Sequence, residues 1–429
     1  HNFSANHTLS ARYLYNDQLQ TGFGSQVTPA GLLNISPTTQ HAGNLWLTSV
    51  LSNKIVNELR FAVQTLDTAT SPEDPTSLEI PSIEISELGL NGFNAGPTRT
   101  AIGYGVNLPQ SRKNQTWQIQ ETFTYMTGNH NLKSGFDLRR NNVDSDFNPT
   151  IRGRLAYGTL QNYVDDVALG AAINKPLPGG QLVVNYKWDD YYVFLQDEWR
   201  AHPNLTLSLG LRYELPGNAV ESLVDLNGNV MTVAGNDPRY ALSPVPKKDT
   251  NNFQPRVGFN WNPHTGTGGL LGFLTGGDKL VVRGGFARTN DYQFLNLALN
   301  IASSFPFVGA ITLAPTRQPD GTNAVSNAFG RLPGASVSGD PMLLTRTVVA
   351  EDFRAPILDQ FSIELQRQLT DHFVFRAGYI GTRGKDLFQT LEGNPLRQFS
   401  TVRQDPTRGI IRLRTNTGES TYHSLQLSG

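Results

Sequence analysis

Charged side chains in this sequence recur at alternate positions of otherwise apolar segments. The segment 205–214 has leucine or tyrosine at every odd position, whereas its even positions include Arg212 and Glu214. Guanidinium and carboxylate groups in this pattern can bind charged solutes or one another, provided that water reaches their side of the segment. The candidate polar residues at such positions are Lys133, Asp137, Arg139, Arg212, Glu214, Arg256, Arg283 and Arg376.

No pattern of residues predicts catalysis, a metal or a cofactor. The chain has 8 histidines and 0 cysteines, and no two histidines have the spacing of a metal site. His130, His202 and His372 fall at expected tight turns, where polar residues are common. We therefore expect no catalytic, cofactor or metal site in this chain.

Three short motifs look like ligand-binding loops at first sight. The segment 144–148 begins like a calcium loop, but Pro149 stands where that loop needs glycine and Leu155 where it needs glutamate. The segment 225–229 is interpreted as a hairpin turn within a long loop. The glycine-rich segment 378–385 matches neither phosphate-binding pattern.

The composition indicates an ordered protein without a strongly charged surface. Of 429 residues, 38% are hydrophobic and 17% charged, and the formal net charge of -1 argues against a nucleic-acid partner. No apolar run is long enough for a transmembrane helix. The chain starts at His1 without a signal peptide and stops within a strand pattern, which predicts an internal piece of a longer protein.

Alternation with a period of two predicts about twelve β-strands and little helix. One short helix is expected near 160–169. The predicted strands cover 7–17, 40–52, 54–67, 113–127, 130–141, 186–201, 204–215, 252–262, 279–289, 357–369, 372–384 and 410–428.

Short and long connections alternate between these strands, so one end of the sheet has tight turns and the other has large loops. This asymmetry is typical of outer-membrane β-barrels, whose turns are periplasmic and whose loops are extracellular. The connection 263–278 should be tight but is long and rich in glycine. The long connections are 18–39, 68–112, 142–185, 216–251, 290–356 and 385–409.

A soluble β-sandwich would also have one apolar face, but three features favour a membrane barrel. The predicted strands exceed the usual length of about 5–6 residues, and loops as long as 290–356 are rare in compact domains. Aromatic residues also occur near both ends of the apolar faces, as in the girdles of membrane barrels. This predicted aromatic girdle comprises Tyr125, Trp199 and Trp261 near the short turns, and Trp117, Tyr191, Tyr213 and Tyr379 toward the long loops.

The cost of burying charge in lipid assigns the two faces. A lysine or arginine facing lipid at mid-bilayer costs roughly 2–4 kcal/mol, so the candidate polar residues must face a hydrated interior. Glu121 and Asp197 are exceptions, because strict alternation puts both on the apolar face. Their nearness to tight turns, or a β-bulge, would lower the cost.

The segment 294–301 is apolar although it lies in a long loop. We expect it to pack against the mouth of the barrel, and the alternative is a surface that contacts ligand.

Four segments together carry a family resemblance. They read YYVFLQDEWRAHPNLTLSLGLRYE at 191–214, TGNHNLKSGFDLRR at 127–140, FRAPILDQFSIELQRQL at 353–369 and YIGTRGKDL at 379–387. The sequence resembles the barrel region of Oar-like TonB-dependent outer-membrane transporters over nearly its whole length. The resemblance implies a barrel of about 22 strands that encloses a plug, with uptake energised through the TonB protein. No plug and no TonB-contacting segment is recognised here, so no energy-coupling residue is carried over.

We therefore expect 1–429 to be one partial antiparallel transmembrane β-barrel domain in a Gram-negative outer membrane, completed by a plug and further strands outside this sequence. Its partners would be the lipid bilayer, the plug, the TonB system and an unknown solute. The loops 68–112, 290–356 and 385–409 would form the outer recognition surface. The alternatives are a passive porin, a surface barrel for adhesion or export, and a soluble β-rich protein that binds or hydrolyses carbohydrate.

Overall fold

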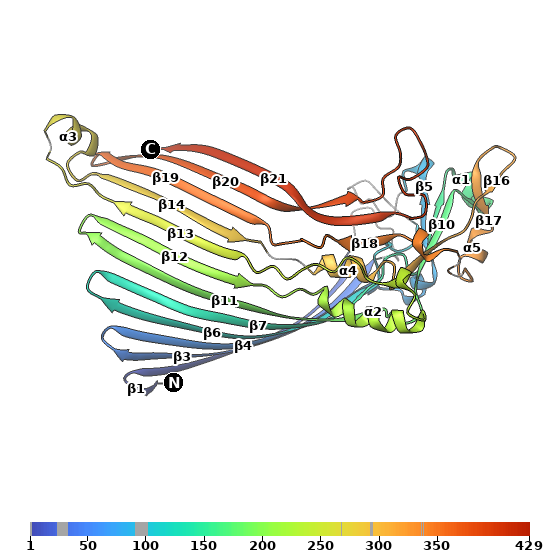
Figure 1. The fold of residues 1–429 in the computed structure, drawn as a ribbon, viewed down its shortest axis with the longest axis horizontal. Helices are drawn as coiled ribbons and strands as arrows, with labels where there is room; N and C mark the ends of the chain where they lie inside the picture. The colour runs from blue at the N-terminus through green and yellow to red at the C-terminus, as the bar shows by residue number, and fades with distance from the viewer. Residues whose placement is uncertain are drawn as a thin grey trace.

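The computed structural model describes residues 2–23, 33–90, 102–266, 268–291, 295–335, 337 and 339–429. One 14-stranded sheet dominates it, in the order β1-β2-β3-β4-β6-β7-β11-β12-β13-β14-β19-β20-β21-β18 (Figure 1). Twelve long strands of this sheet are antiparallel to their sequence neighbours. They are β2 (His7–Phe23), β3 (Asn34–Ser52), β4 (Ile55–Pro72), β6 (Gln110–Thr127), β7 (His130–Phe147), β11 (Val183–His202), β12 (Leu205–Leu215), β13 (Asn252–Trp261), β14 (Leu280–Asn290), β19 (Ile357–Thr370), β20 (Phe373–Glu392) and β21 (Ile411–Ser428).

These strands confirm the twelve predicted from alternation, but several run further into the long connections. The strand β7 continues to Phe147 and β20 to Glu392, beyond the predicted ends at 141 and 384. The additional residues pair with neighbouring strands, which satisfies their backbone hydrogen bonds. Alternation of apolar residues does not predict these strand ends, because many of their residues are polar.

The pairing register gives the sheet one polar and one apolar face. A cross-strand row through Asp137, Tyr192, Glu214 and Asn252 lies on the polar face. Large apolar side chains on the other face remain uncovered by protein, with 60% of Leu195 and 48% of Leu211 exposed. A sandwich core would bury such residues. We therefore exclude the sandwich and assign the apolar face to lipid.

The sheet is open rather than closed into a full barrel. Its outermost strands are β1 (Asn2–Ser4), which forms a hairpin with β2, and β18 (Arg346–Val349), which pairs in parallel with the start of β21. The short turns lie at the left of Figure 1 and the long loops at the right. The described residues contain no helix that is both long and apolar enough to cross a bilayer.

The long loops fold into a layer of their own, with two apolar cores. Besides β18, this layer contains η1 (Pro75–Glu79), β5 (Ser82–Ile85), η2 (Ser86–Leu88), β8 (Arg154–Tyr157), α1 (Leu160–Val164), β9 (Val167–Ala168), β10 (Gly170–Pro176), α2 (Glu221–Val233), η3 (Pro238–Tyr240), α4 (Asn296–Ala302), β15 (Val308–Thr312), β16 (Thr316–Arg317), β17 (Asn323–Ser326), α5 (Ala328–Arg331) and η4 (Pro341–Leu343). The remaining helix, α3 (Gly269–Thr275), lies at the opposite end, on the short-turn side.

Three predictions about connections have clear outcomes. The segment 225–229 is not a hairpin turn, because it lies inside α2, whose residues Leu223 and Val230 are buried. The predicted helix near 160–169 is present as α1. The segment 294–301 packs as expected, since α4 joins the core that rests on the loop ends of β7 and β11; its first residue lies outside the described part.

Candidate functional site

Four of the predicted polar residues meet around one aromatic ring on the polar face. The guanidinium of Arg139 lies 5.3 Å from the centre of the Tyr192 ring, and that of Arg212 lies 4.7 Å from it. Arg139 pairs with Asp137 at 2.8 Å, and Arg212 pairs with Glu214 at 2.6 Å. Two cations therefore share an aromatic surface while each keeps its own carboxylate.

The sheet register brings these residues together. Tyr192 of β11 lies directly between Asp137 of β7 and Glu214 of β12, and each arginine stands two residues from its acidic partner on the same strand. Residues two apart on a strand share a face. The alternation in the sequence groups these charged residues on one face of the sheet, but it does not single out Tyr192, which lies on the same face.

The acidic residues of this cluster are buried. Only 4% of Asp137 and 6% of Glu214 is exposed, and the neighbouring Asn252 and Gln254 are also buried. Asn252 Oδ1 and Gln254 Nε2 have no hydrogen-bond partner among the described residues. Because buried polar atoms are normally paired, these two amides keep hydrogen-bonding capacity that a water molecule or a polar solute could use.

A second zone of the polar face is hollow, and it is lined by one cation, Arg256, that has no ion-pair partner in the described part of the chain. A hollow of about 620 Å³ lies across β12 to β20, lined by small residues such as Ser208 and Gly258, with Arg256 at its side. Lys133, Arg256 and Arg376 form no ion pair with any side chain in the described ranges, whereas Arg283 lies 3.9 Å from Glu364. Arg256 can therefore attract an anionic group to the hollow.

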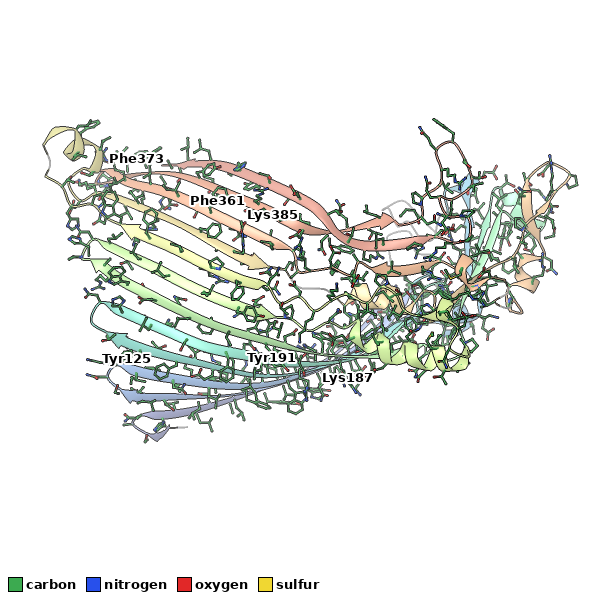
Figure 2. All side chains as sticks on the ribbon, viewed as in Figure 1. Tyr125, Lys187, Tyr191, Phe361, Phe373 and Lys385 are labelled. Atoms are coloured by element: carbon green, nitrogen blue, oxygen red, sulfur yellow. The ribbon has the colours of Figure 1, made fainter. Side chains whose placement is uncertain are left out.

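The aromatic residues of the predicted girdle lie on the apolar face. The nine residues Trp117–Tyr125 of β6, and Tyr191–Trp199 of β11, match the roughly 9–11 residues that a tilted strand needs to cross a bilayer. In Figure 2, Tyr125 and Phe373 lie toward the short turns, and Tyr191 lies closer to the loops.

The other three girdle residues occupy the same face. Tyr213 of β12 is paired with Phe253, and Trp261 of β13 is paired with Leu205 next to a short turn. Tyr379 does not lie toward the long loops as predicted. It stands in the half of β20 nearest the short turn, because this strand continues to Glu392.

The two acidic residues on the apolar face are paired rather than turned away by a bulge. The imidazole Nδ1 of His130 lies 2.7 Å from Asp197 Oδ2, and the His130 ring stacks on Trp199. The amide of Asn57 donates a hydrogen bond to Glu121. His130 is therefore more than a polar turn residue, because it pairs with Asp197. The register of the two strands brings this pair together.

Arg152 holds three segments of the loop layer together. Its guanidinium donates hydrogen bonds to the carbonyl oxygens of Ile80, Tyr104, Gly105 and Leu108 at 2.6 to 3.0 Å. Burial lowers the pKa of Arg152 to about 10, so it remains protonated at neutral pH. A cation bound by neutral carbonyls indicates a structural role.

Among the described residues, no group of three or more histidine, aspartate or glutamate side chains is arranged to hold a metal ion. The geometry of the polar face is instead suited to binding through charge, hydrogen bonds and one aromatic ring.

Comparison with known proteins identifies the family. A sequence model of the outer-membrane β-barrel domain matches residues 1–429. The chain belongs to this outer-membrane β-barrel family. No curated protein sequence matches it. Membership places the strands in an outer membrane.

One solved structure superimposes on this chain with a TM-score above 0.5, and two others are less similar. The outer-membrane transporter YddB from Escherichia coli superimposes with a TM-score of 0.56 at 12% sequence identity, over 99% of this chain and 43% of that chain. The FrpB iron transporter from Neisseria meningitidis superimposes with a TM-score of 0.49 at 12% sequence identity, over 99% of this chain and 48% of that chain. The siderophore receptor PirA from Pseudomonas aeruginosa superimposes with a TM-score of 0.47 at 10% sequence identity, over 99% of this chain and 51% of that chain. The barrel chain thus spans about half the length of these proteins.

Proposed function

We propose that this chain is part of the barrel wall of a TonB-dependent outer-membrane transporter that imports a large or scarce solute. The folded loop layer is the observation that carries the proposal. Its core packs on Val143, Val184 and Tyr186, which lie on the lumenal face at the loop end of the barrel. A passive pore needs an open passage at that point, whereas an energised transporter needs a mouth that binds its solute and then releases it.

The lumenal cations support the same proposal. Lys133, Arg256 and Arg376 have no acidic partner among the described residues, and a plug or an anionic solute in the lumen would supply one. The loops 68–112, 290–356 and 385–409 would form the recognition surface, because strands and turns from all three meet in the loop layer.

Energy dependence is the decisive test. Cells that express the full-length protein would be offered labelled ferric siderophore, oligosaccharide and peptide, with and without a protonophore. We expect one of these solutes to accumulate and its uptake to fall at least tenfold when the inner membrane is de-energised. Deletion of any of the three loops should reduce its capture and leave membrane insertion intact.

The passive porin predicts different results in the same system. Uptake would be insensitive to the protonophore, and the full-length protein would conduct ions steadily in planar bilayers. Either result would contradict the transporter. If none of the three deletions changes capture of the solute, the loops do not form the recognition surface.

A further inference from the structure

The long connection between β13 and β14 forms a small structure at the short-turn end of the barrel. Its base is closed by a hydrogen bond from the Thr265 amide to the Gly277 carbonyl at 2.8 Å. Between these two residues lies α3, at the far end of the molecule from the loop layer (Figure 1). The neighbouring connections at this end are tight turns, so the β13–β14 connection is unusually long for this side of the barrel.

The polarity of α3 is the reverse of that of a helix on a water-soluble surface. Its large apolar residues point away from the protein, with 74% of Leu270, 67% of Leu271, 70% of Phe273 and 49% of Leu274 exposed. Its buried positions include Thr275, whose hydroxyl lies within hydrogen-bond distance of Thr265 and donates to the Leu271 carbonyl. An apolar patch of this kind normally has a partner.

The position of α3 identifies lipid as that partner. The guanidinium of Arg367 lies 5.6 Å from the centre of the Phe273 ring. Arg367 shares the lipid-facing side of β19 with Leu365 and Ile363, because these residues are two apart on one strand. The apolar surface of α3 is therefore continuous with the lipid-facing band of the barrel.

The charge pattern fits the same partner. No aspartate, glutamate, lysine or arginine occurs from 262 to 277, and Asp278 and Lys279 directly precede β14. A neutral apolar segment next to a cationic side chain at the membrane boundary is suited to the zone between lipid headgroups and acyl chains.

We propose that α3 is an interfacial anchor that inserts Leu270, Leu271, Phe273 and Leu274 into the periplasmic leaflet of the outer membrane. The anchor would fix the depth of the β13–β14 hairpin, while Arg367 reaches the headgroups. This proposal does not depend on the transported solute or on energy coupling, and it holds equally for a passive barrel.

Site-directed spin labelling of the full-length protein in lipid bilayers tests the anchor directly. The label would be placed at Leu271→Cys, in a background without other cysteines. Leu195→Cys on the lipid-facing side of β11 provides the lipid reference. Asn53→Cys, in the exposed tight turn between β3 and β4, provides the water reference.

We expect the label at position 271 to collide freely with oxygen and poorly with a water-soluble nickel chelate. Its oxygen-to-nickel ratio should resemble that at position 195 and exceed that at position 53 several-fold. A ratio like that at position 53 would place α3 in water and overturn the proposal. Protection from both reagents would also overturn it, because a protein partner or a second copy would then cover the helix.

Discussion

An acidic side chain on the lipid-facing surface is tolerated here because a neighbouring strand supplies a polar partner. Asp197 faces His130 at 2.7 Å, and Glu121 accepts a hydrogen bond from Asn57. Both pairs lie toward the short turns, where water and headgroups are near. Removing one partner of a buried polar pair costs more than replacing both, since the remaining group loses its compensation.

A double-mutant cycle on the His130–Asp197 pair measures this effect. His130→Ala should lower the free energy of unfolding by about 1–3 kcal/mol, because it leaves the carboxylate without its donor. Adding Asp197→Leu to that variant should restore most of the loss. The measurement is reversible urea unfolding of the full-length protein in lipid or detergent.

Asp197→Asn serves as the control, because an amide can keep the hydrogen bond to His130. It should behave nearly like the native protein. If His130→Ala has no effect, or if the second substitution deepens the loss, the pair does not stabilise the barrel in the way described.

At the scale of elements, α2 shows how burial overrides a local turn signal. Asn227-Gly228 is a strong turn sequence, yet it lies within Glu221–Val233. Leu223, Leu226 and Val230 share one side of the helix and bury it in the loop core. The side chain of Asn227 accepts a hydrogen bond from the Leu242 amide and donates one to the Tyr240 carbonyl, which ties the helix to the following segment.

Gly228→Ala distinguishes the helix from a turn. The position is open, with nothing within 4 Å of an added Cβ, and it does not have a positive φ. Alanine should therefore stabilise α2 by about 0.5–1 kcal/mol, slowing amide hydrogen exchange in the helix roughly two- to fivefold.

Gly235→Ala is the matched control. Gly235 is also open, but it has φ 67° just beyond the end of α2, a conformation that disfavours alanine. It should speed exchange at the end of the helix. Faster exchange in Gly228→Ala would indicate that the segment is a turn after all.

At the scale of the whole molecule, the chain has two parts with different sources of stability. The barrel wall depends on strand pairing and on lipid outside it, whereas the loop layer has two apolar cores of its own. Arg152 links loop segments that are far apart in sequence through backbone carbonyls at 80 and 104–108. The loops therefore pack into one body and are not separate, independent loops.

Arg152→Met should loosen this body without affecting the barrel. The carbonyls would lose a charged donor, and hydrogen bonds to charged groups contribute about 1.5–3 kcal/mol each. Amide exchange in 77–80 and 102–108 should rise at least tenfold, while β6 and β7 remain protected. Arg152→Lys keeps the charge but has fewer donors and should give an intermediate rate. Equal exchange in all three proteins would contradict the role of Arg152 as a link.

The sequence alone determined the strands, their two faces and the alternation of short turns with long loops. Side chains alternate along a strand, so local pattern alone predicts that Arg212, Arg256, Arg283 and Arg376 face a hydrated interior. Strand length, long loops and aromatic residues near both ends of the apolar faces indicated a membrane barrel from the sequence alone.

Only the tertiary structure decided which residues from different strands meet. The ring of Tyr192 between Arg139 and Arg212, and the pairing of His130 with Asp197, depend on register over many residues, which no local pattern encodes. The helix α2 and the packed loops likewise form because distant apolar side chains bury one another. Such long-range burial outweighs the turn and loop preferences that a sequence displays.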